Sequence, residues 1–425
     1  MTPGAGRPAG IALVAVLGLA LLAGCEGDPE PTAVERADAG GTTDAEVVTP
    51  TPEAGPAPDA AEPRDADPGE PEPEPPRYEP AVPLQPRSEP LAVWTGQEAL
   101  VIGGVDIRDE VRRDGAAYLP GQGWRALARA PTPLSAAYAA AWTGQALLVV
   151  EPTVPAVLRY DPEADAWEER EAPEAARRLG AVAGWSGAEL LLAGGSHPDD
   201  EAAGGVQDRD DAWAYDPRAD RWRELDPLPS GPRPGAVGGW TDAGLVVAGG
   251  RDEGFEPVGD TVRYDPEDEA WEPLDDVPEE VPLGGEVVWT GQELVALAGA
   301  GGVALEPGAG EWRVLAERGE PPGVGEQLVW TGDTLLVVGG LAFAVDDDGV
   351  TARARDSVTA YDPAEDAWSA WPPAPLEARQ AAAVAWTDAG LFVWGGDDGR
   401  FEDLTRFDDG ALLEDPEGDW RRLEP

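Results

Sequence analysis

Short apolar and polar runs alternate along most of the chain, and the same succession of runs returns seven times from about Leu91 onward. A small apolar stretch, as at residues 180–185, is followed by a tight polar turn and then by a continuous apolar run, as at residues 335–340. An alternating stretch, as from Trp222 to Leu225, closes each copy. Continuous apolar runs indicate strands buried on both faces, and alternation indicates strands buried on one face. Each copy therefore predicts four short strands, named a, b, c and d in chain order.

Two series of tryptophans mark the copies. The first series ends strand a, as Trp-(Thr/Ser)-(Gly/Asp), at Trp94, Trp142, Trp185, Trp240, Trp289, Trp330 and Trp386; the second lies on strand d, at Trp124, Trp167, Trp222, Trp271, Trp312, Trp368 and Trp420. From each second-series Trp to the next first-series Trp is 18 residues in all six cases. The interval between strands b and c varies widely instead. A constant interval predicts a packed framework, and a variable interval predicts a surface loop.

Three further motifs recur in register. Gly-Gly ends strand b in five copies, Trp-x-x-Leu lies on strand d, and Tyr-Asp-Pro-x4-Trp starts at Tyr160, Tyr215, Tyr264 and Tyr361. Together these motifs resemble the kelch repeat of the kelch and galactose-oxidase propeller superfamily, over roughly residues 88–425. The resemblance implies an all-β fold, a kelch-like β-propeller of seven four-stranded blades with strand a innermost and the repeat Trp and Tyr packed between blades.

Two copies depart from this pattern, and the ring needs a closing element. The second copy has Glu151-Pro152 in place of Gly-Gly, and the fifth has Leu305-Glu-Pro in place of Tyr-Asp-Pro, so both are expected to be plain scaffold blades. Tyr78-Glu-Pro is a candidate for a degenerate strand d that helps to close the ring.

The N-terminal residues predict a targeting signal. Arg7 precedes the apolar run from Ile11 to Leu22, whose 12 residues suit the core of a signal peptide and fall short of the ~20 that span a bilayer. The run ends in Leu22-Ala23-Gly24-Cys25, which resembles the lipobox of bacterial lipoproteins.

The lipobox resemblance implies that residues 1–24 are a lipoprotein signal peptide and that Cys25 is lipidated. The chain would then be lipid-anchored in the bacterial cell envelope, and we expect the outer membrane because Glu26 stands where an inner-membrane retention signal would have Asp. The alternative is an ordinary signal peptide cleaved near Ala23. Residues 25–77 are acidic and rich in Pro and Ala, so they predict a disordered tether that precedes a propeller domain at residues 78–425.

Charge and composition exclude several classes of function. The chain has 83 acidic residues against 30 basic ones, all Arg, which gives a formal net charge of −53. Such a chain should repel nucleic acid and anionic lipid headgroups, so the lipid on Cys25 is the only expected membrane contact. One His and one Cys exclude a His/Cys zinc centre, a disulfide framework and the copper centre of galactose oxidase. We therefore predict a monomeric binding module without cofactor or metal, and no enzyme.

Four arginines are the candidate binding residues. Arg87, Arg178, Arg233 and Arg379 each stand seven residues before a first-series Trp, where the other copies have Ser135, Pro282 and Gly323. This d–a connection leads to the mouth of the axial channel, on the same face as the b–c loops. Kelch propellers often bind acidic peptides with arginines near this place, and the Arg fork suits carboxylates. The alternative is that each arginine pairs with a neighbouring acidic residue and only braces its blade.

The sequence thus predicts recognition of a protein, peptide or glycan at the face that bears the b–c loops. One alternative is an envelope enzyme that acts on glycans through two carboxylates. Another is a calcium-dependent adhesin that uses the acidic runs at residues 199–201 and 346–348, although neither run has the spacing of a calcium loop. His197 lies in a variable loop without a suggested partner and is expected at the surface.

Overall fold

The structure, a computed structural model, describes residues 79–423 except 80, 137, 199–204, 253, 255, 279–282, 284, 298–300, 321–322, 347–348, 401–402 and 415–419. The described residues all belong to one compact unit. The expected signal peptide (residues 1–24), Cys25, the tether (residues 25–77) and Tyr78 lie outside the described residues. Within the described part, no helix is long and apolar enough to cross a membrane.

The unit is built from antiparallel sheets, and seven of those in the described residues have four strands in the order a-b-c-d. The first three are β2 (Leu91–Trp94), β3 (Ala99–Ile102), β5 (Gly115–Leu119) and β6 (Gly123–Ala126); β7 (Ala140–Trp142), β8 (Leu147–Glu151), β9 (Ala156–Asp161) and β10 (Ala166–Glu171); and β11 (Val182–Trp185), β12 (Leu190–Ala193), β15 (Ala212–Asp216) and β16 (Arg221–Leu225). The next two are β17 (Val237–Thr241), β18 (Gly244–Ala248), β19 (Thr261–Asp265) and β20 (Ala270–Leu274); and β21 (Val287–Trp289), β22 (Leu294–Ala296), β23 (Val303–Glu306) and β24 (Glu311–Val314). The last two are β26 (Gln327–Trp330), β27 (Leu335–Val338), β30 (Val358–Asp362) and β31 (Ala367–Trp371); and β32 (Ala383–Thr387), β33 (Gly390–Trp394), β34 (Gly410–Leu413) and β35 (Trp420–Leu423).

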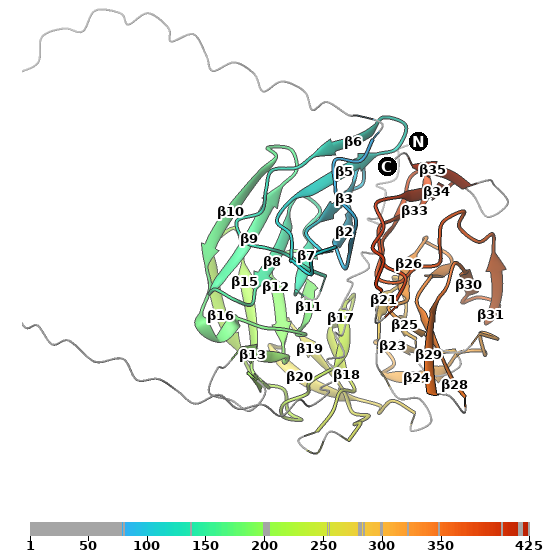
Figure 1. Cartoon of the computed structure of the whole chain (residues 1–425). Helices are drawn as coiled ribbons and strands as arrows, with labels where there is room; N and C mark the ends of the chain where they lie inside the picture. Colours follow the sequence, from blue (N-terminus) through green and yellow to red (C-terminus); the bar gives the residue numbers. More distant parts are fainter. Residues whose placement is uncertain are drawn as a thin grey trace, which may run out of the picture. The chain divides into compact units, whose positions relative to one another are not determined.

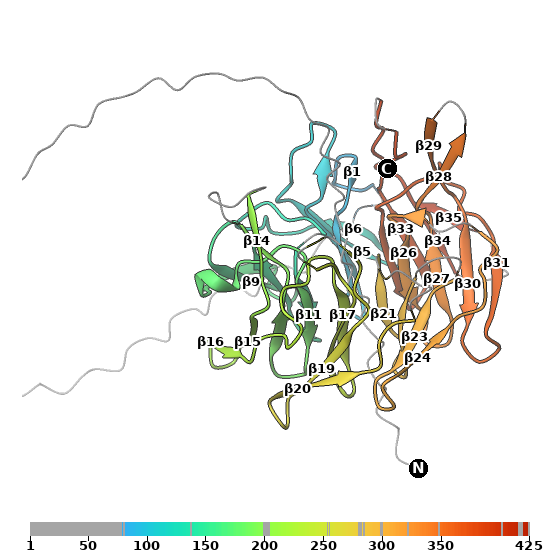
Figure 2. The same ribbon diagram turned by 90° about the horizontal axis from the view of Figure 1, so that it is seen from below.

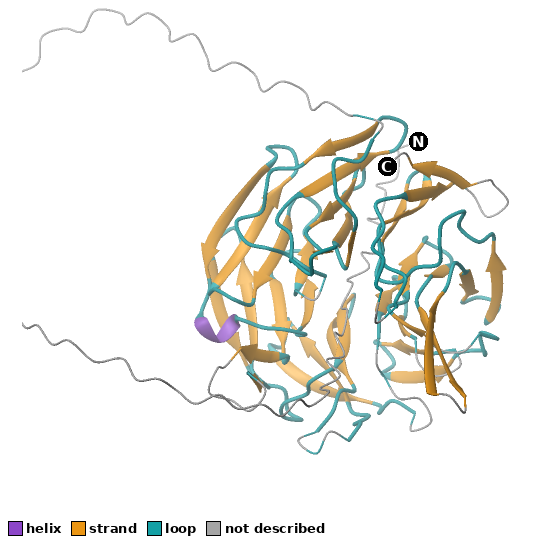
Figure 3. Cartoon of the chain, viewed as in Figure 1, coloured by secondary structure: helices purple, strands orange, loops and turns teal. Residues whose placement is uncertain are grey.

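Smaller elements lie in the connections. β1 (Arg87–Ser88) pairs with β4 (Val105–Asp106), β13 (Ser196–Pro198) pairs with β14 (Val206–Asp208), and β25 (Gly323–Val324), β28 (Leu341–Asp346) and β29 (Gly349–Ala354) form a three-stranded sheet. One short 3₁₀ helix, η1 (Glu174–Ala176), is present in the described residues. Figure 3 shows how strands dominate the unit.

The sheets follow one another around a common centre, with the strands a nearest that centre and the strands d outermost (Figure 1). Neighbouring strands a lie side by side, as β11 does with β7 and β17, and β32 with β26 and β2. This confirms the predicted all-β fold of repeated four-stranded antiparallel units, in an arrangement consistent with a β-propeller.

Buried apolar clusters join each sheet to the next. Leu100 and Ile102 of β3 pack with Leu147 and Val149 of β8, and equivalent clusters link the following sheets. The last sheet packs on the first in the same way. Its Phe392 ring lies 5.4 Å from that of Tyr118, centroid to centroid. Full burial of one such side chain contributes about 1.5–3 kcal/mol, so these clusters hold the sheets together.

The Tyr-Asp-Pro motif builds a repeated turn between strands c and d. In the second copy, Tyr160 Oη donates to Asp165 Oδ1 at 2.7 Å, and Asp161 Oδ1 accepts the backbone N–H groups of Glu163 and Ala164. Asp165 has φ +45°, a conformation that Asp tolerates better than most residues. The copies at Tyr215 and Tyr361 repeat the Tyr to Asp bond.

The second-series tryptophans lock each sheet to the preceding one. Trp167 Nε1 donates to the Ala128 carbonyl at 2.9 Å, and Trp222, Trp271, Trp368 and Trp420 make the same kind of bond to the sheet before. Trp124 is fully buried, whereas most of the repeat tryptophans are partly buried and pack against the clusters. The repeat Trp are thus framework residues, as their constant spacing predicted.

Candidate functional site: the loop-bearing end of the sheets

The two ends of the sheets differ. We call the end with the b–c loops and the d–a connections the loop end, and the end with the a–b and c–d turns the turn end. All the small extra sheets belong to the loop end, since β4, β13, β14, β28 and β29 lie in b–c loops and β1 and β25 in d–a connections. In Figure 2, β1, β14, β28 and β29 lie along the upper side of the sheets. The four arginines that the sequence predicts as binding residues lie at this end.

Arg87 is buried in the corner of its own sheet. Its Nη2 lies 3.1 Å from Asp114 Oδ2, and its Nη1 donates to the carbonyl of Gly103 at 2.9 Å. Its Nε donates to the carbonyl of Gln85 in the d–a connection. The side chain therefore ties the d–a connection, the end of strand b and the start of strand c together.

The other three arginines are placed in the same way. Arg379 pairs with Asp409 at 2.9 Å and donates to the Gly395 carbonyl at 2.8 Å, Arg233 pairs with Asp260 and donates to the Gly249 carbonyl, and Arg178 pairs with Asp211. All four are buried. In the described part of the chain no hydrogen bond or ion pair joins one of these arginines to another. The arginines thus have the geometry of the bracing alternative, and we call each Arg with its Asp an arginine brace.

Two of the braces lower the pKa of their aspartates. Burial alone would raise the pKa of Asp114, but the hydrogen bond and the charge of Arg87 outweigh burial and hold this pKa below its ordinary value. The pKa of Asp211 is lowered for the same reason by Arg178, with help from the indole N–H of Trp213. Burial lowers the pKa of Arg379, and Asp409 opposes that effect.

Glycine is required in the Gly-Gly pair because the d–a connection that follows passes too close to leave room for a side chain. Gly103 has φ +69°, and a Cβ there would lie 2.0 Å from the carbonyl oxygen of Leu134. The second copy, which lacks Gly-Gly, uses a different corner, in which buried Glu151 accepts hydrogen bonds from the backbone N–H and hydroxyl of Thr153.

The aspartates of the braces were missed by sequence reasoning. An Asp stands 10 or 11 residues before the strand-d Trp in the four copies with the arginine, and in none of the other three. The interval from each arginine to its aspartate changes with the length of the b–c loop, and this variation hides the pairing. The signal was therefore present, but only when measured from the end of the repeat.

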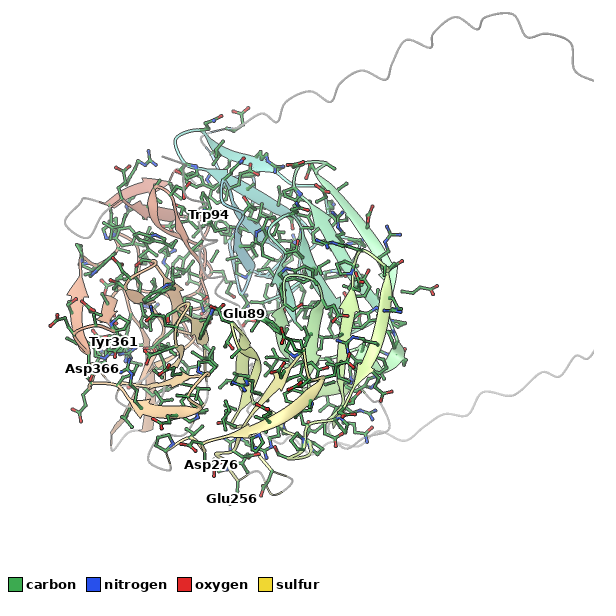
Figure 4. The ribbon with its side chains drawn as sticks, turned by 180° about the vertical axis from the view of Figure 1, so that it is seen from behind. Glu89, Trp94, Glu256, Asp276, Tyr361 and Asp366 are labelled. Carbon is green, nitrogen blue, oxygen red and sulfur yellow. The ribbon has the colours of Figure 1, made fainter. Side chains whose placement is uncertain are left out.

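Glu89 lies near the common centre of the sheets (Figure 4). It has φ +55°, its backbone N–H donates to the Ala381 carbonyl, and its carbonyl accepts from Ala136 N. Burial raises the pKa of Glu89, the negative charge of Asp397 raises it further, and Arg406 opposes both. A carboxyl that holds its proton more tightly than usual therefore stands at the junction of the first and last sheets.

Two expectations about the variable loops have different outcomes. His197 is partly covered rather than fully exposed: its side chain is 12% exposed, and its Nε2 lies 3.1 Å from the carbonyl oxygen of Glu174 in η1. The acidic runs fall partly outside the described residues. Within the residues that are described, no group of three or more His, Cys, Asp or Glu side chains could hold a metal ion.

Comparison with known proteins provides evidence about the fold only. No model of a protein family matches the chain, and no curated protein matches it either. Among solved structures, the chain is similar to YjhT, a kelch-type β-propeller protein, with a TM-score of 0.54 and 16% sequence identity over 70% of this chain and 99% of that one. At this identity the likeness shows the fold alone.

Proposed function

We propose that the chain is a binding module of the bacterial cell envelope. In this proposal residues 1–24 direct export, lipid on Cys25 anchors the chain at the outer membrane, and residues 25–77 form the tether. The domain at residues 78–425 recognises a protein, peptide or glycan at its loop end, and it acts as a monomer without cofactor or catalysis. The lipobox at residues 22–25 and the acidic, Pro-rich composition that follows it support the anchor and the tether.

We further propose that the seven four-stranded sheets are the blades of a closed kelch-like propeller. Contacts between the last and first sheets support closure: Arg421 Nη2 donates to Tyr118 Oη at 3.2 Å, and Glu89 N donates to the Ala381 carbonyl at 2.9 Å. The first contact is equivalent to the one that Arg313 makes with Tyr361 between the fifth and sixth sheets. Glu79 adds a single β-bridge to Trp124, at the outer edge of the first sheet rather than as a strand of the last.

One observation carries the binding proposal: the b–c loops of the loop end differ from copy to copy, whereas the Tyr–Asp turn of the turn end repeats in three copies. The b–c loops fold into β4, the β13–β14 hairpin and the β28–β29 hairpin, which differ from copy to copy, on a framework that repeats. Binding residues are commonly carried on loops that a rigid scaffold positions. The arginine braces serve this function indirectly, because they fix the bases of the b–c loops and leave ligand contacts to the exposed loop residues.

Peptide and glycan arrays test this function. The full chain carrying Cys25→Ser would be compared with a variant whose β13–β14 hairpin (residues 196–208) is replaced by a short turn and with a variant altered in the turn at residues 216–220. We expect the parent to bind a subset of the peptides or glycans. Replacement of the hairpin, or of another b–c loop, should change which peptides or glycans are bound. If the variant altered at residues 216–220 lost as much peptide or glycan binding as the hairpin variant, binding at the loop end would be contradicted.

Glu89 favours a second candidate, a glycan-acting enzyme. A carboxyl with a raised pKa beside an acidic neighbour, here Asp397, is the arrangement that general acid and base catalysis uses. Release of reducing sugar from an array-positive glycan, abolished by Glu89→Gln with binding retained, would support it. Binding without turnover would favour the module.

A further inference from the structure

The exposed large apolar side chains of the described residues gather at the loop end. They are Ile107, Val111, Val154, Val206, Val314, Val324, Phe343 and Leu404. Seven of them lie in b–c loops or d–a connections, and Val314 ends the strand that leads into such a connection. Ile107 is 63% exposed and Phe343 is 43% exposed, so neither is covered by its own domain. In the described residues, the turn end presents no comparable side chain.

Five of these side chains belong to three consecutive blades. Val324 and Phe343 come from the sixth blade, Leu404 from the seventh, and Ile107 and Val111 from the first. We call these five residues the apolar arc.

Contacts between the loops of these three blades hold the elements that carry the arc close to one another. β25 pairs with β28, which joins the parts of the sixth blade. A Cβ at Gly399 of the seventh blade would lie 2.3 Å from Leu341 Cδ1 of β28, so the two loops are packed together. Arg406 of the seventh blade pairs with Asp109 of the first at 2.9 Å and donates to Ser88 Oγ.

The surroundings of the arc are negative. Acidic residues outnumber basic ones in the connections of these three blades. Several of the arginines there pair with carboxylates, as Arg112 does with Asp106 and Arg400 with Asp398. Glu110 and Asp109 expose most of their side chains. Anionic membrane lipid would be repelled by such a surface, whereas a segment with positive side chains would be attracted.

We propose that the apolar arc binds a cationic amphipathic segment of a partner protein. Apolar side chains of that segment cover Ile107, Leu404 and Phe343, and its Arg or Lys side chains face the carboxylates beside them. Exposed apolar side chains with charged residues next to them in the same loops are a common composition of protein interaction sites. This inference rests on the proposed binding function and specifies its partner.

The probe for the test is a fluorescent amphipathic peptide of Leu and Lys. Its control is a Ser/Lys peptide of equal length and charge, in which Ser replaces every Leu. The full chain carrying Cys25→Ser is compared with an arc variant, Ile107→Ser/Phe343→Ser/Leu404→Ser, and a matched off-arc variant, Val154→Ser/Val206→Ser/Val314→Ser. Both variants lose three exposed apolar side chains, so their melting temperatures should stay close to that of the parent.

We expect the parent to bind the Leu/Lys peptide at least about tenfold more tightly than the arc variant does. The off-arc variant should bind the Leu/Lys peptide as the parent does, and the Ser/Lys peptide should bind more weakly and equally to all three proteins. Failure of the parent to bind the Leu/Lys peptide, equal losses in the two variants, or equal binding of the two peptides would each overturn the proposal. Array binding to a glycan or an acidic peptide, unaffected by the arc variant, would leave the binding function standing while rejecting this partner.

Discussion

At the turn end, the link between strands c and d is built the same way in copy after copy, whereas at the loop end each copy builds its own connection. Tyr361 and Asp366, which form one of the repeated turns, lie together at the outer side of the sheets in Figure 4, while Glu89 lies near the centre. The turn end encloses its polar groups in local hydrogen bonds. The loop end fixes its bases with buried ion pairs and leaves apolar side chains uncovered. One end of the repeat is thus constrained by folding, whereas the connections at the other end vary from copy to copy.

Removal of a brace should produce the largest effect. Arg87→Ala removes the buried partner of Asp114 and leaves it only Arg112, at 3.5 Å. Loss of one member of a buried pair costs up to about 3–5 kcal/mol. We expect a large drop in the denaturant midpoint, and Arg87→Lys should restore little because Lys lacks the fork. Arg108→Ala, at an exposed position of the same blade, is the control and should change the midpoint little. A midpoint for Arg87→Ala equal to that of the control would reject the brace.

The glycine corner should be next in size. In Gly103→Ala the new Cβ would meet the Leu134 carbonyl at 2.0 Å and also strain a backbone at φ +69°, so we expect a loss of about 1–3 kcal/mol. Gly96→Ala is the matched control. Gly96 has φ +93° and open space around it, so this substitution introduces backbone strain without a steric clash. Equal melting temperatures for the two variants would show that the close approach is not a constraint.

A copy without a brace should respond to pH in the opposite sense to the braced copies. Burial raises the pKa of Glu286 to about 8, with the charge of Glu326 adding to burial and hydrogen bonds from Leu328 N and Gln327 Nε2 opposing it. This folded-state pKa lies above the ordinary value of 4.5, so the contribution of protonated Glu286 is complete below about pH 4.5 and is lost as pH rises through about 8.

The slope of that loss is about 1.4 kcal/mol per pH unit, and Glu286→Gln should remove it. Melting curves of the parent and the variant from pH 5 to 9 check this. The lowered pKa values of Asp114 and Asp211 act at the acid side instead, where their stabilisation is lost as pH falls below their ordinary range. Parallel pH profiles for the parent and Glu286→Gln would contradict the assignment.

The smallest effect is expected at the turn end. Tyr361→Phe removes the hydroxyl that donates to Asp366 at 2.6 Å and accepts from Arg313 at 3.0 Å, which should cost about 0.5–1.5 kcal/mol. Ligand binding should be unchanged, since the turn lies away from the loops. Loss of peptide or glycan binding in this variant, with its fold intact, would break the division between the two ends.

The framework was predictable because its intervals are constant. The spacing from the strand-d Trp to the next strand-a Trp measures packed backbone, and it located the strands of all seven copies. The pair Arg87 and Asp114 was only half predictable, since the loop between them varies in length and hides the partner. The bidentate pairs of Arg125 with Glu98, Arg223 with Glu189 and Arg313 with Glu293 were missed altogether. They join strand d to the a–b turn in copies where both residues occur, and nothing in the local pattern shows that these strand ends lie close.

The candidate site was less predictable than the fold for a physical reason. An arginine in a glycine-rich connection can face a channel or turn back to a carboxylate, and the choice depends on burial that the sequence does not show. His197 illustrates the same limit, because the sequence does not show the contact with Glu174 in η1 that partly covers it. The apolar arc depends on contacts between the loops of the first and last blades, which are far apart along the chain.

The division between the two ends can be tested most directly by hydrogen exchange of the full chain, carrying Cys25→Ser, with and without the Leu/Lys peptide. We expect slower exchange in residues 105–114, 341–354 and 397–409 when the peptide is bound, and unchanged exchange in the turns at residues 161–165, 216–220 and 362–366. Protection of those turns, with the loops unchanged, would contradict that division.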